Sequence, residues 1–436
     1  MKWVSRLLIL VVGGGIAAGG APAQAAESVG ADQSPRADSR HQAIATITPA
    51  DLPRTEVGRG QQEVRTGQSC TAIAPAARAA VGGAVKSCVD TTPQAVSRTG
   101  SAGTAAANEA CDITLPGYWT WTRTSGLCLN GMTVTYTLYS DRGAVLGTGV
   151  MNVATSMTLS QSSAAWNESV TVKVTGVSGE VKSLDIAFDV ACTSTCSATT
   201  NRPWPGSRNV GPGASASGTV TYRSAVASGA RDTNIQTKYH MYVTTAGSIP
   251  TTPNVYWDSP VQAPIRCDAE LSTPGCVIPE RRAILEYSVS DPNHGEAAAL
   301  YQFAQAYLRG WAPLSRTDSE AIRDANRERT CGAGSSDPFV FMPEYVPNDS
   351  CDEFPFAGTY EGGTDGRLCA DILPLYEDGQ WVLYEARADK PVTFNEPCVR
   401  GHVDVDANSS AGGKYGAFVR NQRVLDTEKF DVHAVS

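Results

Sequence analysis

The sequence predicts a chain of several domains, in which an antiparallel β-sandwich precedes a disulfide-stapled α+β domain. Three observations support this fold class. Alternating β-branched segments recur between residues 133 and 243, and helical periodicity appears after residue 263. Twelve cysteines are spread over 436 residues, a length that suits two or three domains.

The β-sandwich is expected over residues 108–262. Its segments place an apolar side chain at every second position, as in a half-buried strand, and Gly, Ser, Asn and Asp separate them. These segments are 133–139, 170–174, 184–190, 219–222 and 239–243. We interpret the aromatic residues of this domain as core, and a carbohydrate-stacking surface is the alternative: Tyr118, Trp119, Trp121 and Trp166.

The α+β domain is expected over residues 263–436. A helix is predicted over residues 297–308, because apolar side chains recur there at helical spacing. Those side chains are Leu300, Phe303, Ala304, Tyr307 and Leu308. A second helix is predicted over residues 318–328, with Thr317 as its N-cap. Short strands and cysteine-pinned loops are expected from there to the end.

The N-terminus predicts export. Lys2 and Arg6 precede an apolar run, and A-x-A cleavage sites follow at Ala23 and Ala25. Residues 1–25 are therefore expected to be a cleaved signal peptide of a secreted, extracellular bacterial protein without a membrane anchor; an uncleaved anchor helix is the alternative. Residues 26–107 are poor in large apolar side chains and are predicted to form a disordered leader or pro-region.

The even number of cysteines in an exported chain predicts up to six disulfides. Sequential pairing is the simplest expectation, because each bond then stays within one local region. Cys192 and Cys196 also have a spacing found in metal sites. A zinc site is not favoured, since no second Cys or His pair follows nearby at finger spacing.

The charge distribution argues against a general affinity for polyanions. The chain has a net charge of −9. From residue 263 onward there are 16 Lys and Arg against 28 Asp and Glu, a net of −12. Because DNA-binding domains are usually basic, three alternatives stay open: a local group of cations binds the phosphates, a bound metal cation does most of this work, or the domain has lost catalysis and binds another ligand. The candidates for the local group are Arg400, Lys414, Arg420 and Arg423.

Residues 351–363 carry the main candidate site. Asp352, Glu353 and Glu361 lie within ten residues of each other, around Pro355 and before a Gly-Gly turn. Carboxylates repel one another unless a cation or a shared proton holds them together, although a surface turn is the simpler alternative. The chain has no G-x-S-x-G, P-loop, dinucleotide-binding or H-E-x-x-H motif. A site built from carboxylates and amides is therefore expected.

Residues 351–363 resemble the D-E-(aromatic)-P…E-G-G signature of the NucA/NucB-type secreted deoxyribonucleases. The tail is also similar, with Asn408, two glycines, and a segment containing Asn421 and Gln422 before a terminal strand. The resemblance covers about residues 266–436. It implies a metal-dependent endonuclease related to the ββα-metal nucleases, in which a strand supplies a general base and a following helix supplies a metal ligand.

The resemblance also implies a role for each candidate residue. Asp352 corresponds to the general base, with Glu353 and Glu361 as the acidic residues beside it. The expected metal ligands are Asn408, Asn421 and Gln422. The charge distribution, rather than the resemblance, gives the expected substrate-binding residues Lys414, Arg420 and Arg423. Oxygen ligands of this kind favour Mg²⁺, Mn²⁺ or Ca²⁺.

The sequence thus predicts a secreted, sequence-nonspecific endonuclease that hydrolyses DNA. The alternative from another class is a noncatalytic cell-wall or carbohydrate-binding protein, with polysaccharide bound by the β-domain. A glycosidase that uses two of the same carboxylates is a third interpretation.

Overall fold

In a computed structural model of the protein, the described residues are 41–49, 60–63, 69–93, 110–111, 115, 117–245, 254–308 and 313–435. The expected signal peptide lies outside these residues. In this part of the chain no helix has both the length and the apolar character that crossing a membrane requires.

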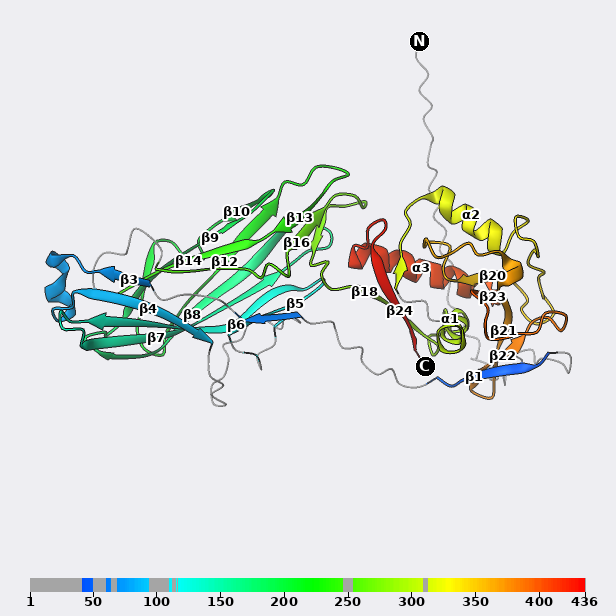
Figure 1. Ribbon diagram of the computed structural model, residues 1–436, viewed down its shortest axis with the longest axis horizontal. Coiled ribbons are helices and arrows are strands. Elements are labelled where there is room, and N and C mark those ends of the chain that lie inside the picture. The colour runs from blue at the N-terminus through cyan, green and yellow to red at the C-terminus, as the bar shows by residue number, and fades with distance from the viewer. Residues whose placement is uncertain are drawn as a thin grey trace, which may run out of the picture. The chain divides into compact units, whose positions relative to one another are not determined.

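The β-sandwich consists of two antiparallel sheets that share one core (Figure 1). Among the described residues, the larger sheet has nine strands: β2 (Gly60–Glu63), β3 (Ser69–Ala72), β4 (Lys86–Pro93), β5 (Tyr118–Thr122), β6 (Gly126–Tyr139), β7 (Val145–Thr158), β8 (Ala165–Gly179), β10 (Cys196–Thr200) and β12 (Ser215–Ser224). The facing sheet has four: β9 (Leu184–Cys192), β11 (Ser207–Val210), β14 (Thr237–Thr244) and β15 (Val255–Asp258).

The predicted strand segments lie within β6, β8, β9, β12 and β14. Alternate side chains are buried, as the period-two pattern predicts, and Val134, Tyr136 and Leu138 all face the core. Trp119, Trp121 and Trp166 are also buried there. The interpretation of these three as core is confirmed, whereas Tyr118, the fourth aromatic residue of the group, is half-buried.

A third, three-stranded sheet contains β13 (Arg231–Ile235), β16 (Ile265–Asp268) and β17 (Gly275–Val277). Its later strands fall after the predicted domain boundary at residue 263. Their apolar side chains nevertheless belong to the sandwich core, whose last member is Ile278. The next core residue along the chain after Ile278, Ala283, belongs to the second core. The later strands join the sandwich because β16 pairs with β13, which lies before the predicted boundary, and β17 pairs with β16.

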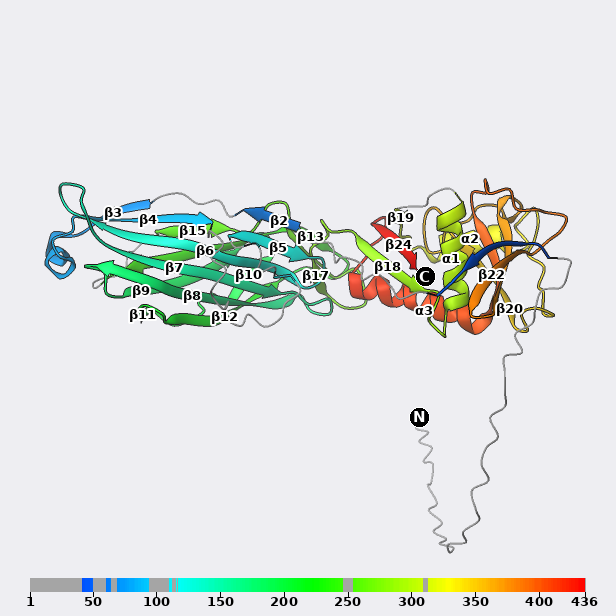
Figure 2. The same ribbon diagram turned by 90° about the horizontal axis from the view of Figure 1, so that it is seen from below.

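Part of the predicted disordered leader is ordered, so that prediction is wrong for its described residues. They contain β1 (Ala43–Ile47), β2, β3, β4 and the 3₁₀ helix η1 (Pro75–Val81). The composition argument fails because these strands extend sheets whose cores are formed elsewhere. β4 pairs with β6, and β1 pairs antiparallel with a strand of the second domain, as Figure 2 shows.

The second domain is built on a five-stranded sheet with the order β1-β22-β21-β23-β20. Its other strands are β20 (Asp349–Phe354), β21 (Ala370–Glu377), β22 (Gln380–Glu385) and β23 (Val399–Asp404). β20 is therefore an edge strand, paired antiparallel with β23. A smaller sheet contains β18 (Ala283–Ser288), β19 (Leu314–Ser315) and β24 (Lys429–Val435). This agrees with the predicted α+β class.

The described residues of this domain contain three α-helices: α1 (Gly295–Tyr307), α2 (Glu320–Thr330) and α3 (Val405–Gln422). There is also a short 3₁₀ helix, η2 (Gly366–Leu368). α1 and α3 pack on the five-stranded sheet and against each other. α1 confirms the first predicted helix. α2 begins two residues later than predicted, because Ser319 rather than Thr317 caps it by accepting a hydrogen bond from the Ile322 amide.

Hydrophobic periodicity does not predict α3, and strands and loops are expected in this region. Gly412, Gly413 and Gly416 lower its intrinsic helix propensity. Asp404 begins the helix by accepting a hydrogen bond from the Asp406 amide, and the buried side chains of Ala411, Phe418 and Val419 hold it in place.

All twelve cysteines lie in the described part of the chain and form six disulfides, so sequential pairing is confirmed. The pairs are Cys70–Cys88, Cys111–Cys128, Cys192–Cys196, Cys267–Cys276, Cys331–Cys351 and Cys369–Cys398. The Cys192–Cys196 bond excludes these two thiolates as metal ligands. Disulfides in this number are typical of proteins from an oxidising compartment.

Candidate active site

A cavity of about 670 Å³ opens along the edge strand β20, and we call it the β20 cleft. One wall comes from α2 and the segment before it, and the other wall comes from α3. Its lining includes polar and aromatic side chains, namely Tyr301, Arg316, Arg323, Arg327, Asp352, Glu353, Asn408, Tyr415 and Arg420. An edge strand flanked by two helices thus presents carboxylates and arginines to one space.

Asp352 lies on β20 and is 5% exposed. Its Oδ2 accepts a hydrogen bond of 2.7 Å from the Tyr301 hydroxyl of α1, and its Oδ1 accepts one of 2.9 Å from the Glu353 amide. Burial raises the pKa of Asp352 well above its ordinary value, and the charge of Glu353 raises it further, whereas the two hydrogen bonds oppose this shift. A carboxylate with a raised pKa is a stronger base than an exposed one.

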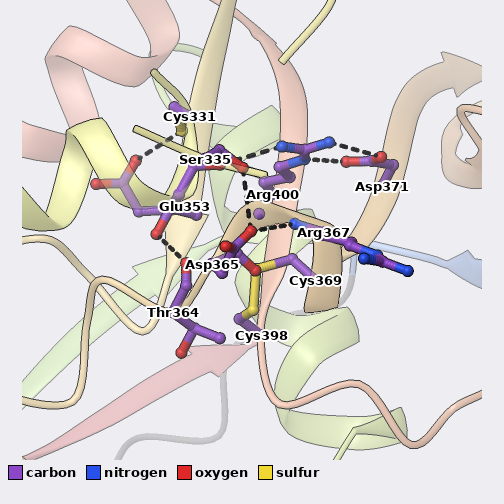
Figure 3. The surroundings of a disulfide bond; sticks show 12 residues. Cys331, Ser335, Glu353, Thr364, Asp365, Arg367, Cys369, Asp371, Cys398 and Arg400 are labelled. Atoms are coloured by element: carbon purple, nitrogen blue, oxygen red, sulfur yellow. Dashed lines mark hydrogen bonds and ion pairs between the residues drawn. A yellow bond between two sulfur atoms is a disulfide. The ribbon is translucent and has the colours of Figure 1, made fainter. Parts of the chain in front are cut away.

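Glu353 is the next residue along the strand and is half-buried. Burial raises its pKa to about 7, while the positive charge of Arg327 acts in the opposite direction. Its carboxylate faces Cys331, as Figure 3 shows, with Oε2 at 3.7 Å from the Cys331 sulfur. The Cys331–Cys351 disulfide therefore borders the carboxylate. Although neighbours on a strand alternate faces, both carboxylates reach the β20 cleft because β20 is at the sheet edge.

Asn408 lies in the first turns of α3 and lines the same cleft. Its Nδ2 donates hydrogen bonds of 3.1 Å to the Ser350 hydroxyl and to the Cys351 carbonyl. These bonds fasten the start of α3 to β20 beside Asp352. Because the amide nitrogen is directed at the strand, the amide oxygen is turned away from it, which suits a ligand role.

Asn421 and Gln422, the other predicted amide ligands, are not brought to this site. Asn421 follows Asn408 by 13 residues on one helix, which corresponds to about 20 Å along the axis. Neither residue lines the β20 cleft. Asn421 is exposed, and the Gln422 carbonyl accepts a hydrogen bond of 2.8 Å from Arg123. The prediction that they share a cation with Asn408 is therefore wrong.

Glu361 is also absent from the cleft lining. It is exposed, and its Oε2 accepts a hydrogen bond of 2.7 Å from the Ser315 amide. This bond ties the turn after β20 to β19. The structure therefore places Asp352 and Glu353 together and leaves the third predicted carboxylate outside.

The predicted group of cations is mostly used elsewhere. Arg423 is 1% exposed, and its guanidinium pairs with both carboxylate oxygens of Asp268. Arg400 is equally buried and pairs with Asp371, as Figure 3 shows. The Lys414 ammonium lies 5.7 Å from the centre of the Tyr287 ring, outside the cleft lining. Of the predicted substrate-binding residues, Arg420 alone lines the cleft.

Three cleft arginines are missing from the predicted site: Arg316, Arg323 and Arg327. The latter two are four residues apart on α2 and therefore lie on one helix face. That spacing was visible in the sequence, but the orientation of this face toward β20 depends on tertiary packing. Tyr301 is also missing from the predicted site, because the sequence identifies the segment around it only as a helix with a buried face.

Histidine does not replace the carboxylates here. None of the five histidines of the chain, all of which are described, lines the β20 cleft. His402 is buried on β23 and its Nδ1 lies 2.7 Å from Asp349 Oδ2. The groups in the cleft that titrate as bases are thus Asp352 and Glu353.

Within the described residues, no three His, Cys, Asp or Glu side chains form a metal-binding group. A cation in the β20 cleft would have few protein ligands, namely one or two carboxylates and the Asn408 amide. Mg²⁺ is commonly bound in this way, with water and substrate phosphate completing the shell. The donor set therefore fits a hard divalent cation, and it does not fit a structural zinc site.

No protein-family model matches this chain, and no curated protein matches it in sequence.

Proposed function

We propose that the second domain is a metal-dependent endonuclease that hydrolyses DNA phosphodiester bonds, with Asp352 as the general base. The observation that carries this proposal is the composition of the β20 cleft. A buried carboxylate with a raised pKa, a second carboxylate, an anchored amide and four arginines line one cavity. Basic side chains that bind phosphate beside a carboxylate base suit phosphodiester hydrolysis better than the chemistry of a neutral substrate.

Asp352 would take the proton of the attacking water. The Tyr301 hydroxyl holds one carboxylate oxygen, and the Glu353 amide holds the other, so the orientation of the base is set before the substrate binds. Each oxygen keeps a further lone pair for the water. Burial among α1, β20 and α3 limits competing bulk water around the base.

Glu353 and Asn408 are the residues that would hold the cation. When bound there, a divalent cation supplies positive charge that stabilises the charge developing on the phosphate. The arginines of both walls add fixed positive charge to the same space. The six disulfides support the proposed extracellular location, because such bonds persist in oxidising compartments.

The ββα arrangement offers further support. β20 and β23 are antiparallel neighbours, and α3 follows β23 directly. The strand carries Asp352 and the helix carries Asn408, in the order that the resemblance implies. The carbohydrate-binding alternative loses its aromatic argument, because Trp119, Trp121 and Trp166 are core residues.

Nicking of supercoiled plasmid DNA by the purified protein tests the proposal. We expect nicking with Mg²⁺ or Mn²⁺ and none with EDTA. Asp352→Asn should abolish nicking, whereas Glu344→Gln, an exposed acid in a loop away from the cleft, should leave it unchanged. Equal activity of the wild type and Asp352→Asn would exclude Asp352 as the base, and nicking in EDTA would exclude a metal-dependent reaction.

A further inference from the structure

The β20 cleft contains positive charge that the rest of its domain lacks. Four arginines and two carboxylates line the cavity, although residues 263–436 carry a net charge of −12. Cations elsewhere in the domain, such as Arg400 and Arg423, are buried in ion pairs. A polyanion would therefore be attracted by the cavity and repelled by much of the surface around it.

The arginines come from both walls of the cleft. Arg316, Arg323 and Arg327 come from α2 and the segment before it, and Arg420 comes from α3. Arg327 forms an ion pair with Asp324, in which both side chains are more than half exposed. Exposed pairs of this kind are weak, so this guanidinium is available to a phosphate.

The α3 wall also provides open space and an aromatic ring. A Cβ added at Gly412 would contact no other group, so this part of the helix is open to a ligand. Tyr415 is half-buried in the cleft, where its hydroxyl donates a 2.8 Å hydrogen bond to the Gly358 carbonyl. A positively charged groove with an aromatic ring is the usual composition of a single-strand binding site.

The dimensions of the cleft limit the substrate further. A cavity of about 670 Å³ is of the size that holds a drug-sized ligand. Asp352 is nearly fully buried in it. A flexible single strand can lower one phosphate to this depth, whereas a base-paired duplex must first open locally. A duplex also presents a negative charge about every 1.7 Å of its axis to the acidic surface outside.

We propose that the β20 cleft binds one DNA strand between α2 and α3, and that single-stranded DNA is the preferred substrate. The arginines on both walls bind the phosphates on either side of the scissile bond. This inference rests on the proposed nuclease function for its cleavage prediction, but its binding prediction does not require catalysis.

Binding is measured by fluorescence anisotropy in EDTA, with fluorescein-labelled oligo(dT) of eight nucleotides and a labelled 12-base-pair duplex as probes. We expect the oligo(dT) to bind at least about tenfold more tightly. Its affinity should fall with salt with a logarithmic slope of about −3, the value for four phosphate contacts on a single strand.

Alanine variants of the four arginines identify the binding surface. Arg323→Ala and Arg327→Ala should each weaken oligo(dT) binding and make the salt slope shallower by about 0.7. Arg329→Ala is the matched control, because Arg329 is an exposed residue of the same helix that does not line the cleft. Circular dichroism checks that each variant is folded.

The outcomes separate this inference from the proposed function. A duplex that binds as tightly as oligo(dT), no measurable oligo(dT) binding, or equal losses in Arg327→Ala and Arg329→Ala would overturn the inference. Cleavage of both substrates at equal rates with Mg²⁺ would also overturn it while supporting a nuclease. Arginine-dependent oligo(dT) binding without any metal-dependent cleavage would support the inference for binding and refute the nuclease.

Discussion

Glu168 in the β-sandwich and Asp352 in the second domain are both buried carboxyls that accept hydrogen bonds from tyrosine hydroxyls. Glu168 is 0% exposed, and Tyr239 and Tyr222 each donate a 2.8 Å bond to one of its oxygens. Asp352 accepts a 2.7 Å bond from the Tyr301 hydroxyl. Burial is the main cause of a raised pKa in both residues.

The difference between the two carboxyls is access. Glu168 points into the sandwich core among aromatic and aliphatic side chains. Asp352 lies on an edge strand where the β20 cleft reaches it, with a second carboxylate and four arginines close by. A raised pKa is thus common to a structural and a candidate catalytic group, and the open cavity with its charged neighbours distinguishes them.

The largest effect is expected for Asp352→Asn. Loss of a general base commonly costs 10²–10⁴ in rate, so plasmid nicking with Mg²⁺ should fall about 1,000-fold. The fold should persist, because an amide can keep the hydrogen bond from the Glu353 amide. Glu168→Gln is the matched control and should nick at the wild-type rate. A comparable loss of activity in both variants would mean that Asp352 acts only through structure.

Asn408→Ala should have the next largest effect. Asn408 fastens the start of α3 to β20 and is the proposed amide ligand of the cation. Its loss should reduce nicking about 10- to 100-fold, the range seen when groups supporting a metal site are removed. The Mg²⁺ concentration for half-maximal activity should rise. Asn421→Ala, on the same helix but about 20 Å away, should change neither quantity. Equal effects of both substitutions would place the cation elsewhere.

Much of the sandwich can be predicted because each strand shows its pattern within its own short segment of sequence. Apolar residues alternate with polar ones in β6 and β9, which predicts strands, and alternate side chains of both are buried. Neighbouring cysteines pair in sequence order. β1 and β4 are different, since their short Ala- and Thr-containing segments become strands by pairing with β22 and β6. These strands are stabilised by partner strands that are distant in the sequence, which a local pattern does not reveal.

The candidate site shows the same division. Asp352 and Asn408 are found from their sequence motifs, and the structure brings both to one cleft. Arg423 is predicted to bind the substrate but does not line the cleft, whereas Arg327 lines the cleft but is not predicted. The sequence shows a guanidinium in each case, but only the fold shows that Asp268 neutralises the first and that the second faces the cleft.

Tyr301→Phe should have a smaller effect on catalysis. It removes one hydrogen bond to Asp352, the proposed base, but retains the ring, whose centroid lies 5.7 Å from that of Phe354 and 5.0 Å from that of Phe356. A hydrogen bond to a charged group contributes about 1.5 kcal/mol or more, so nicking should fall about tenfold. Tyr287→Phe is the control, because the Tyr287 hydroxyl donates to the Ala411 carbonyl instead. If the two variants lose activity equally, the Tyr301 hydroxyl has no special role in orienting Asp352.

Glu168→Gln should leave nicking unchanged and alter the pH dependence of stability. The pKa of Glu168 is raised from 4.5 to about 7 in the folded protein. The folded state therefore binds a proton that the unfolded state releases above about pH 4.5, and this stabilisation is lost as the pH rises through about 7. The shift corresponds to about 3 kcal/mol of unfolding free energy between pH 5 and pH 8. Urea unfolding of the disulfide-intact protein, followed by tryptophan fluorescence at both pH values, measures it.

The glutamine variant should lose this contribution to the pH dependence, and Glu180→Gln, an exposed acid of the same domain, should keep it. Identical pH dependence in the wild type and Glu168→Gln would show that the buried carboxyl does not set the stability of the sandwich, and the contrast with Asp352 would then rest on the cleft alone.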